Sequence, residues 1–306
     1  MFATLLGGLP RPPIPESGTA EELVAAALAA QEAAGLEPLA DGGLWGSDDA
    51  QTAAERWRAT TALTDVVVKA VVEGPWSATV RAVPDADPSL FERELAAAAG
   101  AANAALRELV AAGCPLVEVH EPAATSIGAD LAARARFVDA QQRLLDGVHE
   151  THASLAITGG SADEAGVETF LAAPYASLAL DLVRGPDNWR LAAAAPRATG
   201  IVCGAMTADA TGDESVEILL YALNYAASTG GRGPDRVGIA TAGTLEGVSW
   251  DVAERRMRRL GEAVRLAGAP PDERVAAVDP RAVNARSAAL GRSDVRPARR
   301  PPKASG

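Results

Sequence analysis

Apolar residues follow two patterns that alternate along the chain. In one they form short continuous runs, which predict strands with both faces covered. These runs span residues 3–9, 35–41, 65–74, 115–121, 152–160, 177–185, 200–206 and 236–243. In the other they recur every three or four positions in alanine-rich stretches, which predicts helices. The clearest of these stretches span residues 20–34, 89–112, 130–148, 213–228 and 249–267.

Eight strands that alternate with helical segments predict an α/β fold, a single (β/α)8 barrel of the TIM type. We assign residues 1–290 to this domain because no large linker interrupts the pattern. Residues 291–306 are basic and Pro-rich, and we expect a disordered tail there. Catalytic residues of such barrels lie where strands end and the next loops begin. The expected helix N-caps are Ser89, Asp213 and Ser249, and left-handed residues are expected at Gly35 and Gly113.

Composition narrows the possible partners of the chain. Its 306 residues, 48% of them hydrophobic and 22% charged, are typical of a globular protein. A formal net charge of −12 argues against nucleic acid, because phosphate binding needs clustered cations. The chain lacks an apolar run of about 18 residues, which argues against a membrane span, and it lacks a signal-peptide pattern. Cys114 and Cys203 lie in apolar runs, as free thiols do in a reducing cytoplasm. We expect a cytoplasmic protein that binds a small molecule, and the oligomeric state stays open.

The sequence His120–Glu121–Pro122 stands where the strand predicted over 115–121 ends. A histidine titrates near neutral pH and a carboxylate can orient it, so both are candidate catalytic residues for acid/base chemistry. In the alternative, Glu121 accepts hydrogen bonds from loop N–H groups and His120 caps the strand. Successive strand residues point to opposite faces, so we do not expect both side chains in the same cavity.

Asp181 interrupts an otherwise apolar strand and is the third candidate catalytic residue. A carboxylate in a strand is costly to bury unless it is paired, so it serves either chemistry or an ion pair with Arg184. Asp41, which ends another strand before two glycines, has the same two interpretations. Trp76 either presents a flat ring to an aromatic ligand or packs in the core. His152 could bind a metal, but the interpretation we favour places it in solvent at the barrel's opposite end.

Five segments in barrel order resemble the catalytic barrel of cobalamin-independent methionine synthase, in the superfamily shared with uroporphyrinogen decarboxylase. They are TLLGGLPRP (4–12), EAAGLEPLADGG (32–43), VVKAVVEGPWSAT (67–79), AAGCPLVEVHEPA (111–123) and the final strand, turn and helix (235–267). The similarity covers residues 3–267. It implies a (β/α)8 barrel that binds methyl-tetrahydrofolate as the methyl donor and homocysteine as the acceptor, whose thiol a zinc ion activates.

The chain departs from this family at the zinc ligands, which are a histidine, a glutamate and two cysteines. The family's His-x-Cys falls on His152 and Ser154 in one alignment, and on Leu155 and Ile157 in another. The glutamate falls on or near Asp181, and the last cysteine falls on Ala242. Because both cysteines are replaced, we expect no bound zinc.

The residues that bind homocysteine in the family also differ. Gly8 replaces a serine, Gly43 a glutamate and His120 an aspartate, and the nearest polar residues to a missing histidine are Thr207 and Asp209. The resemblance therefore predicts a methyltransferase whose acceptor is unidentified. The alternatives are a metal-free lyase or decarboxylase, with an acidic substrate held by arginines, and a non-catalytic barrel that binds a small molecule. The candidate substrate-binding residues are Gly8, Arg11, Asp41, Trp76, Arg184, Thr207 and Asp209.

Overall fold

The computed structural model describes residues 1–46, 52–84, 87–212, 214–270 and 273, and its centre is one parallel sheet. Seven strands form this sheet in the order β1-β7-β6-β5-β4-β3-β2. They are β1 (Phe2–Ala3), β2 (Ala70–Glu73), β3 (Leu116–His120), β4 (His152–Ile157), β5 (Ser177–Asp181), β6 (Gly200–Met206) and β7 (Val237–Thr241). Each pairs with its neighbours in parallel, as a (β/α)8 barrel requires.

The run over 35–41 lies between the two edge strands and closes the ring. Glu37 N donates to Ala3 O (2.8 Å), which precedes the loop after β1. Farther along, Leu39 N donates to Val67 O (2.8 Å), and Leu39 and Val68 form an isolated parallel bridge. The run does not form the full strand that the sequence predicts, because Pro38 has no N–H to donate to a ladder. The single (β/α)8 barrel predicted from the sequence is confirmed, with this bridge in place of its second strand.

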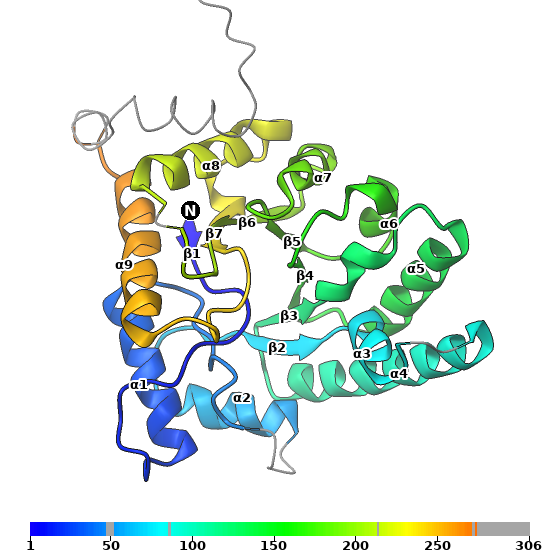
Figure 1. Cartoon of the computed structure of the whole chain (residues 1–306), viewed down its shortest axis with the longest axis horizontal. Helices are drawn as coiled ribbons and strands as arrows, with labels where there is room; N and C mark the ends of the chain where they lie inside the picture. The colour runs from blue at the N-terminus through cyan, green and yellow to red at the C-terminus, as the bar shows by residue number, and fades with distance from the viewer. Residues whose placement is uncertain (47–51, 85–86, 213, 271–272, 274–306) are drawn as a thin grey trace, which may run out of the picture.

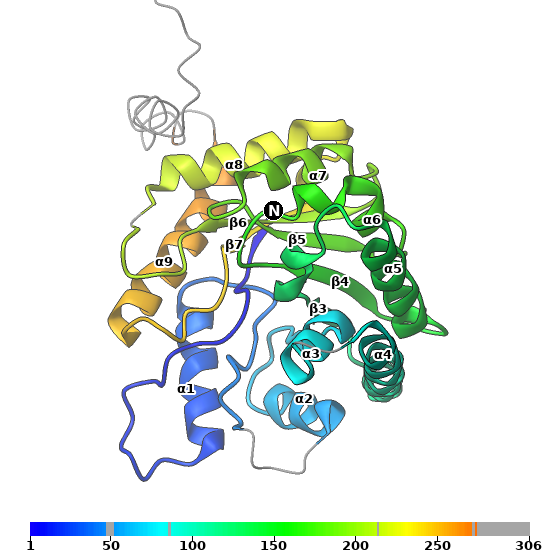
Figure 2. The same ribbon diagram turned by 45° about the vertical axis from the view of Figure 1, so that its right-hand side comes forward.

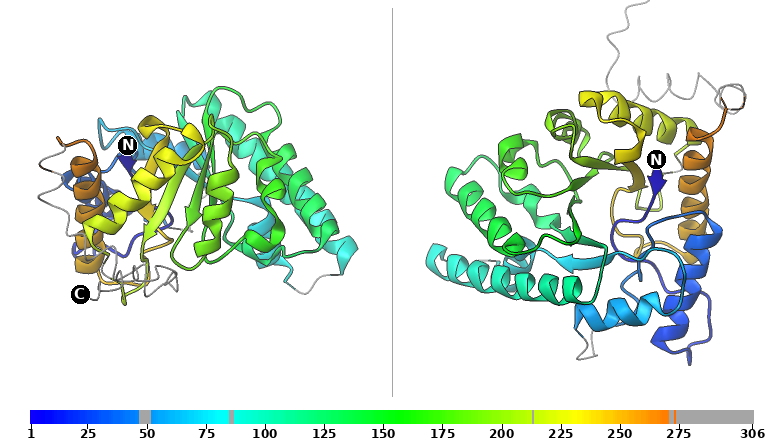
Figure 3. Two further views of the ribbon diagram at one scale, coloured as in Figure 1. Left: turned by 90° about the horizontal axis from the view of Figure 1, so that it is seen from above. Right: turned by 180° about the vertical axis from the view of Figure 1, so that it is seen from behind.

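Helices surround the strands, as Figures 1 and 2 show. They are α1 (Ala20–Ala33), α2 (Ala53–Thr61), α3 (Pro75–Ala82), α4 (Pro88–Ala111), α5 (Leu131–Leu145), α6 (Val167–Leu171), α7 (Trp189–Ala194), α8 (Val216–Ser228) and α9 (Trp250–Ala267). The five predicted helices correspond to α1, α4, α5, α8 and α9, within three residues at each end. Figure 3, which shows the molecule from above and from behind, also places the helices around the curled sheet.

The residues that cap the helices can be compared with the caps predicted from the sequence. Asp87, rather than the predicted Ser89, caps α4, because its carboxylate accepts from the N–H groups of Ser89 and Leu90. Ser249 is the N-cap of α9, as predicted. Gly35 and Gly113 have φ of 74° and 86°, which confirms the predicted left-handed residues. The other predicted cap, at position 213, lies outside the described residues.

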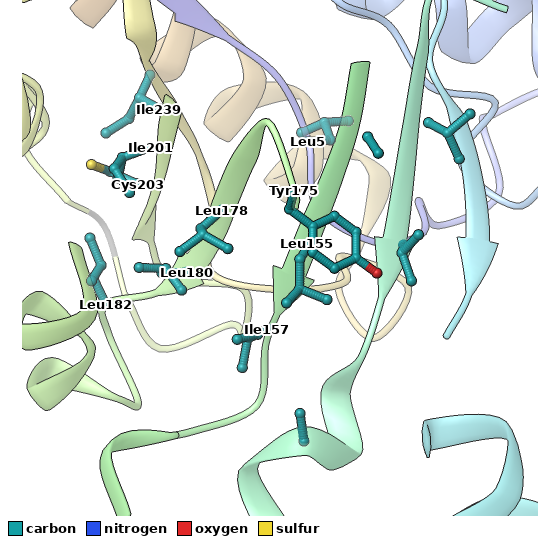
Figure 4. Packing of buried hydrophobic residues seen from close by; sticks show 14 of the residues in the cluster. Leu5, Leu155, Ile157, Tyr175, Leu178, Leu180, Leu182, Ile201, Cys203 and Ile239 are labelled. Carbon is teal, nitrogen blue, oxygen red and sulfur yellow. The ribbon is translucent and has the colours of Figure 1, made fainter. Parts of the chain in front are cut away.

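The core has two layers because side chains alternate along each strand. One face of each strand packs with helix residues in the main hydrophobic cluster. Figure 4 shows Leu155 and Ile157 of β4 beside Leu178 and Leu180 of β5 in this cluster. The other face lines the barrel interior, where a small cluster contains Leu6, Ala156, Ala179, Val202 and Ala240. Both faces are buried, which explains why the strands have continuous apolar runs.

The structure does not test the predictions about the C-terminal end of the chain. The tail over 291–306 and the domain boundary at residue 290 lie outside the described residues, so they stay predictions. Within the described ranges, none of the helices combines the length and the apolar character needed to cross a membrane. Cys114 and Cys203 are both buried and free.

Candidate active site

His120 and Glu121 leave the end of β3 in opposite directions, as strand geometry predicts. His120 pairs in the sheet with Ala156, which lines the barrel interior. Its Nε2 atom is buried and has no hydrogen-bond partner in the described part of the chain. Burial lowers the pKa of His120, and the nearby charge of Glu118 opposes this effect. A neutral imidazole with a free ring nitrogen can accept a proton.

Glu121 lies on the helix side of β3 and is fully buried. Its Oε1 atom accepts from Trp76 N (3.0 Å) and from Gln141 Nε2 (2.6 Å). Its Oε2 atom accepts from Ser77 N (2.8 Å) and Ser77 Oγ (2.6 Å). The carboxyl group therefore joins β3 to the first turn of α3 and to α5. Burial raises the pKa of Glu121 to about 7, although these four hydrogen bonds favour the charged form.

The contacts of Glu121 match the alternative in which it accepts bonds from loop N–H groups. All four of its contacts come from protein donors, and Ser77 Oγ in turn accepts from Ala123 N (3.0 Å). Gln141 accepts from the hydroxyl of Tyr175 (2.5 Å), which extends the buried hydrogen bonds towards β5. The catalytic role of Glu121 stays a prediction, and its contacts assign it the task of holding the end of β3 in place.

Asp181 ends β5 and binds the backbone of two loops. Its Oδ1 atom accepts from Val183 N (2.9 Å) and Arg184 N (2.8 Å), and Oδ2 accepts from Gly159 N (3.1 Å). Burial raises the pKa of Asp181, and these three hydrogen bonds oppose that effect. Arg184 meets Asp181 through its backbone N–H, and its charge lowers the pKa of Asp181, while its guanidinium lies 3.7 Å from Asp209.

The polar residues after β6 are engaged within their own loop. Thr207 N donates to Glu214 Oε2 (2.8 Å), and the Thr207 hydroxyl donates to the other oxygen of Glu214. Asp209 accepts from Thr211 N (2.9 Å) and from the Thr211 hydroxyl. The Thr211 hydroxyl bond holds the pKa of Asp209 below its usual value. Thr207 and Asp209 stay predicted substrate-binding residues, and their contacts order the loop beside the barrel opening.

Three other predicted substrate-binding residues have local contacts. The ring of Trp76 is 5% exposed and packs edge-to-face with Phe91 (5.1 Å between ring centroids) and Phe137 (6.0 Å). This contact set matches the alternative in which Trp76 packs in the core. Arg11 is exposed and donates to carbonyl groups of its own loop. Asp41 accepts from Gly43 N (2.9 Å) and closes the turn after Leu39.

The carboxyl ends of the strands also approach each other across the barrel. A Cβ atom added to Gly243, just after β7, would lie 3.9 Å from the Cβ of Thr158 and 4.0 Å from that of Ala208. Thr158 follows β4, which is not a neighbour of β7 in the sheet. These residues therefore lie close together across the carboxyl end of the barrel, although their strands are not neighbours. We call this carboxyl end of the barrel the mouth.

Comparison with known proteins adds a fold-level assignment. No family model and no curated protein matches the chain. A B12-independent methionine synthase from Shewanella sp. W3-18-1, solved with selenomethionine, is similar with a TM-score of 0.69 and 15% identity. The match covers 86% of this chain and 97% of that one. The chain therefore shares the barrel fold of this methionine synthase.

Two further solved structures have a similar fold. A putative vitamin-B12-independent methionine synthase from Listeria monocytogenes has a TM-score of 0.64 and 15% identity, over 87% of this chain and 96% of that one. A methyltransferase from Methanosarcina mazei has a TM-score of 0.58 and 15% identity, over 86% and 93%. At this identity the likeness shows the shared fold.

The positions that would hold zinc in a methionine-synthase-type barrel do not fit that ion. His152 begins β4, at the end opposite the mouth, and its Nε2 lies 2.8 Å from Ser177 Oγ. In the other alignment, Leu155 and Ile157 face the helices within the apolar core. Asp181 is bonded to three backbone N–H groups, so its oxygens are largely engaged. In the described ranges, no three His, Cys, Asp or Glu side chains are grouped to hold a metal.

Glu246 is a mouth residue that the sequence did not single out. A Cβ atom on Gly8 would overlap the carboxyl group of Glu246, and one on Gly43 would lie 3.7 Å from its Oε1. The side chain of Glu246 therefore occupies the space above the two glycines that replace a serine and a glutamate of the resembled family. It is exposed and lies in the loop after β7. The sequence does show an acidic residue after the last predicted strand. It could not show that this residue lies near Gly8, because that contact depends on closure of the barrel.

Proposed function

We propose that this protein transfers a one-carbon group from a methyl-folate-like donor to a small acceptor at the mouth of the barrel. The observation that carries the proposal is His120, whose buried Nε2 has no described partner at the end of β3. Barrel enzymes place catalytic groups at such strand ends. The likeness to methionine synthase barrels, over 86% of the chain, supports the reaction class.

His120 supplies the acid/base function in this proposal. Methyl transfer breaks the bond from the donor nitrogen to the methyl group and forms a bond from the acceptor to it. The acceptor loses one proton, which a neutral imidazole at the site can take and pass to the donor nitrogen. The lowered pKa of His120 keeps the ring neutral before the reaction. Glu121 acts as a positioning residue, because its bonds to α3 and α5 hold the strand end that carries His120. Asp181 holds the adjoining turns through their backbone N–H groups.

Glu246 gives the acceptor a chemical class. Its carboxylate lies beside Gly8 and Gly43 and makes no ion pair among the described residues, so it is open to a cationic group. We assign it the ammonium group of an amino-acid-like acceptor. The decarboxylase alternative has less support, because Arg184 lies beside Asp209 and Arg11 donates to loop carbonyls. Neither guanidinium is arranged to hold an acidic substrate.

Transfer of a labelled methyl group tests the proposed function directly. Purified protein is incubated with methyl-labelled 5-methyl-tetrahydrofolate and a panel of thiol and amine amino acids, with and without a chelator. We expect labelled product in both conditions. His120→Asn should lower its rate about 10²–10⁴-fold, the usual contribution of a positioned acid/base group. The matched control is His149→Asn, because His149 is exposed, and it should leave the rate unchanged. Equal rates for the two variants would overturn the role of His120.

A second comparison tests the acceptor class. Glu246→Gln should weaken acceptor binding about fivefold or more, as expected for the loss of one charged partner. Glu262→Gln is the control, because Glu262 is an exposed glutamate on α9. A neutral analogue of the acceptor should bind both variants alike. If the wild type binds the donor but transfers no methyl group to any acceptor of the panel, the result would favour a non-catalytic barrel.

A further inference from the structure

The barrel interior has a polar floor at the amino-terminal ends of its strands. Glu118, Ser154 and Ser177 are paired partners on β3, β4 and β5, so they lie side by side at one level. Lys69, just before β2, reaches the same level and contacts Glu118. All four residues are buried, with at most 5% of each residue exposed. We call these residues, together with His152, the floor.

The floor contains an ion pair and two buried oxygen atoms that have no described hydrogen-bond partner. Lys69 Nζ donates to Glu118 Oε2 (2.7 Å) and to Leu5 O (2.6 Å). The other carboxylate oxygen, Glu118 Oε1, is buried and has no described partner, and the same is true of Ser154 Oγ. Buried polar groups are costly unless they are hydrogen-bonded. These two atoms therefore indicate a missing partner between β3 and β4.

A cavity adjoins these atoms and limits what that partner is. Its volume is about 40 Å3, and Lys69, Glu118, His152, Ser154 and Ser177 are among its lining residues. This volume has room for about one or two water molecules. A bound cation would be repelled by Lys69, and a bound anion by Glu118. Water is neutral and both donates and accepts, so it matches Glu118 Oε1 and the Ser154 hydroxyl.

One end of the floor reaches solvent. His152 is exposed at the start of β4, and its Nε2 lies 2.8 Å from Ser177 Oγ. A serine bonded to a histidine can also be a nucleophile and its base. The cavity is too small for a substrate, and Ser177 is 5% exposed, so this chemistry is not supported. The pair instead connects the floor to the surface.

We propose that the floor holds water and passes protons between His152 at the surface and the Lys69–Glu118 pair beneath His120. A proton from solvent binds one ring nitrogen of His152 while the other ring nitrogen gives its proton to Ser177 Oγ. The Ser177 hydroxyl releases its own proton to the water, and the water gives one to Glu118 Oε1. One proton enters and the carboxyl group becomes neutral, so charge and atoms balance.

The route ends directly below the proposed acid/base residue. Glu118 and His120 are two residues apart on β3 and share its inner face. The charged groups around His120 are Glu118 on its own strand, Lys69 before β2, and Glu73 on β2. The cavity also borders Arg236, which donates to Ala198 O. A change of charge at Glu118 is therefore felt by His120, and the floor gives the site an approach for protons that is separate from the mouth.

Exchange of the ammonium protons of Lys69 with water tests this route. The chain has two lysines, Lys69 and Lys303, so lysine labelled with 15N gives two ammonium signals, assigned with Lys303→Arg. Ser154→Val fills the cavity, and His152→Leu removes the entry. We expect the exchange of Lys69 to become at least about tenfold slower in both variants, as for closure of a local opening. The Lys303 signal should not change.

The control is His149→Leu, which changes an exposed histidine three residues from His152 and should leave exchange at Lys69 as in the wild type. If Ser154→Val does not fold, His152→Leu decides the result, because its side chain lies at the surface. Wild-type exchange at Lys69 in a folded His152→Leu variant would overturn the route. Because the experiment uses neither donor nor acceptor, its result is independent of methyl transfer.

Discussion

Replacing Glu121 with glutamine tests how a buried carboxyl group anchors α3 to β3. Burial raises the pKa of Glu121 from 4.5 to about 7, so the group is neutral at pH 5 in the folded protein. A neutral acid can keep all four contacts, because its O–H oxygen accepts from Ser77 N while its proton is donated to Ser77 Oγ. A glutamine NH2 group at that position cannot accept, so Ser77 N loses its partner.

The expected cost follows from one buried N–H group without an acceptor. Such a loss costs about 1–3 kcal/mol, so Glu121→Gln should unfold about 2 kcal/mol more easily at pH 5. That corresponds to a Tm lowered by about 4–8 °C. Folding raises the pKa of Glu121, so the protonated carboxyl group stabilises the wild type. This contribution is fully present below pH 4.5 and is lost as pH rises through about 7. The loss is about 3 kcal/mol and exceeds the difference of about 2 kcal/mol, so by pH 8 the variant should be at least as stable as the wild type.

Urea unfolding of both proteins between pH 4.5 and pH 8 measures this difference, with Glu262→Gln as an exposed control. A gap that widens as pH rises would refute the reasoning, because it would mean that the four hydrogen bonds outweigh burial and favour the charged carboxylate. Methyl transfer by the same variant separates the two interpretations of Glu121. Unchanged turnover per folded molecule, with a destabilised fold, supports a purely structural role and contradicts both positioning and catalysis. Loss of turnover without loss of stability supports catalysis.

Three other substitutions follow from close contacts. Gly74→Ala should destabilise the fold by about 2 kcal/mol or more in urea unfolding, because its Cβ would overlap the anchored carboxyl group of Glu121. Arg232→Lys should cost about 3 kcal/mol, because the guanidinium donates to five backbone carbonyls that a single ammonium cannot reach together. A change under about 0.5 kcal/mol would contradict either prediction. Gly8→Ser should displace the exposed Glu246 and weaken acceptor binding with little change in Tm, and unaltered binding would contradict the proposed contact.

The sequence predicts the barrel well because its signals are local. Continuous apolar runs and helical periodicity identify β3 to β7 and the five long helices. The run over 35–41 shows the limit of that approach, since its apolar pattern is that of a strand while Pro38 breaks the ladder. The cap of α4 shows another: Asp87 and Ser89 are both suitable residues, and only the backbone geometry decides between them.

The site was harder to predict because its contacts join distant parts of the chain. Glu121 meets Ser77 across 44 positions, and Lys69 meets Glu118 across 49. Glu246 reaches Gly8 only because the last strand lies beside the first. Strand alternation did predict that His120 and Glu121 face opposite ways, but sequence could not tell that Glu121 is saturated with donors.

Calorimetric titration with 5-methyl-tetrahydrofolate tests the central claim that the mouth of this barrel binds a one-carbon donor. Gly243→Leu places a side chain between the ends of β4 and β7, where an added Cβ would lie within 4.0 Å of the Cβ atoms of Thr158 and Ala208. Gly247→Leu is the matched control, because no atom lies within 4 Å of its added Cβ. The account predicts saturable binding at one site in the wild type and the control, and its loss in Gly243→Leu. Absence of binding to the wild type, or equal binding by Gly243→Leu, would contradict it.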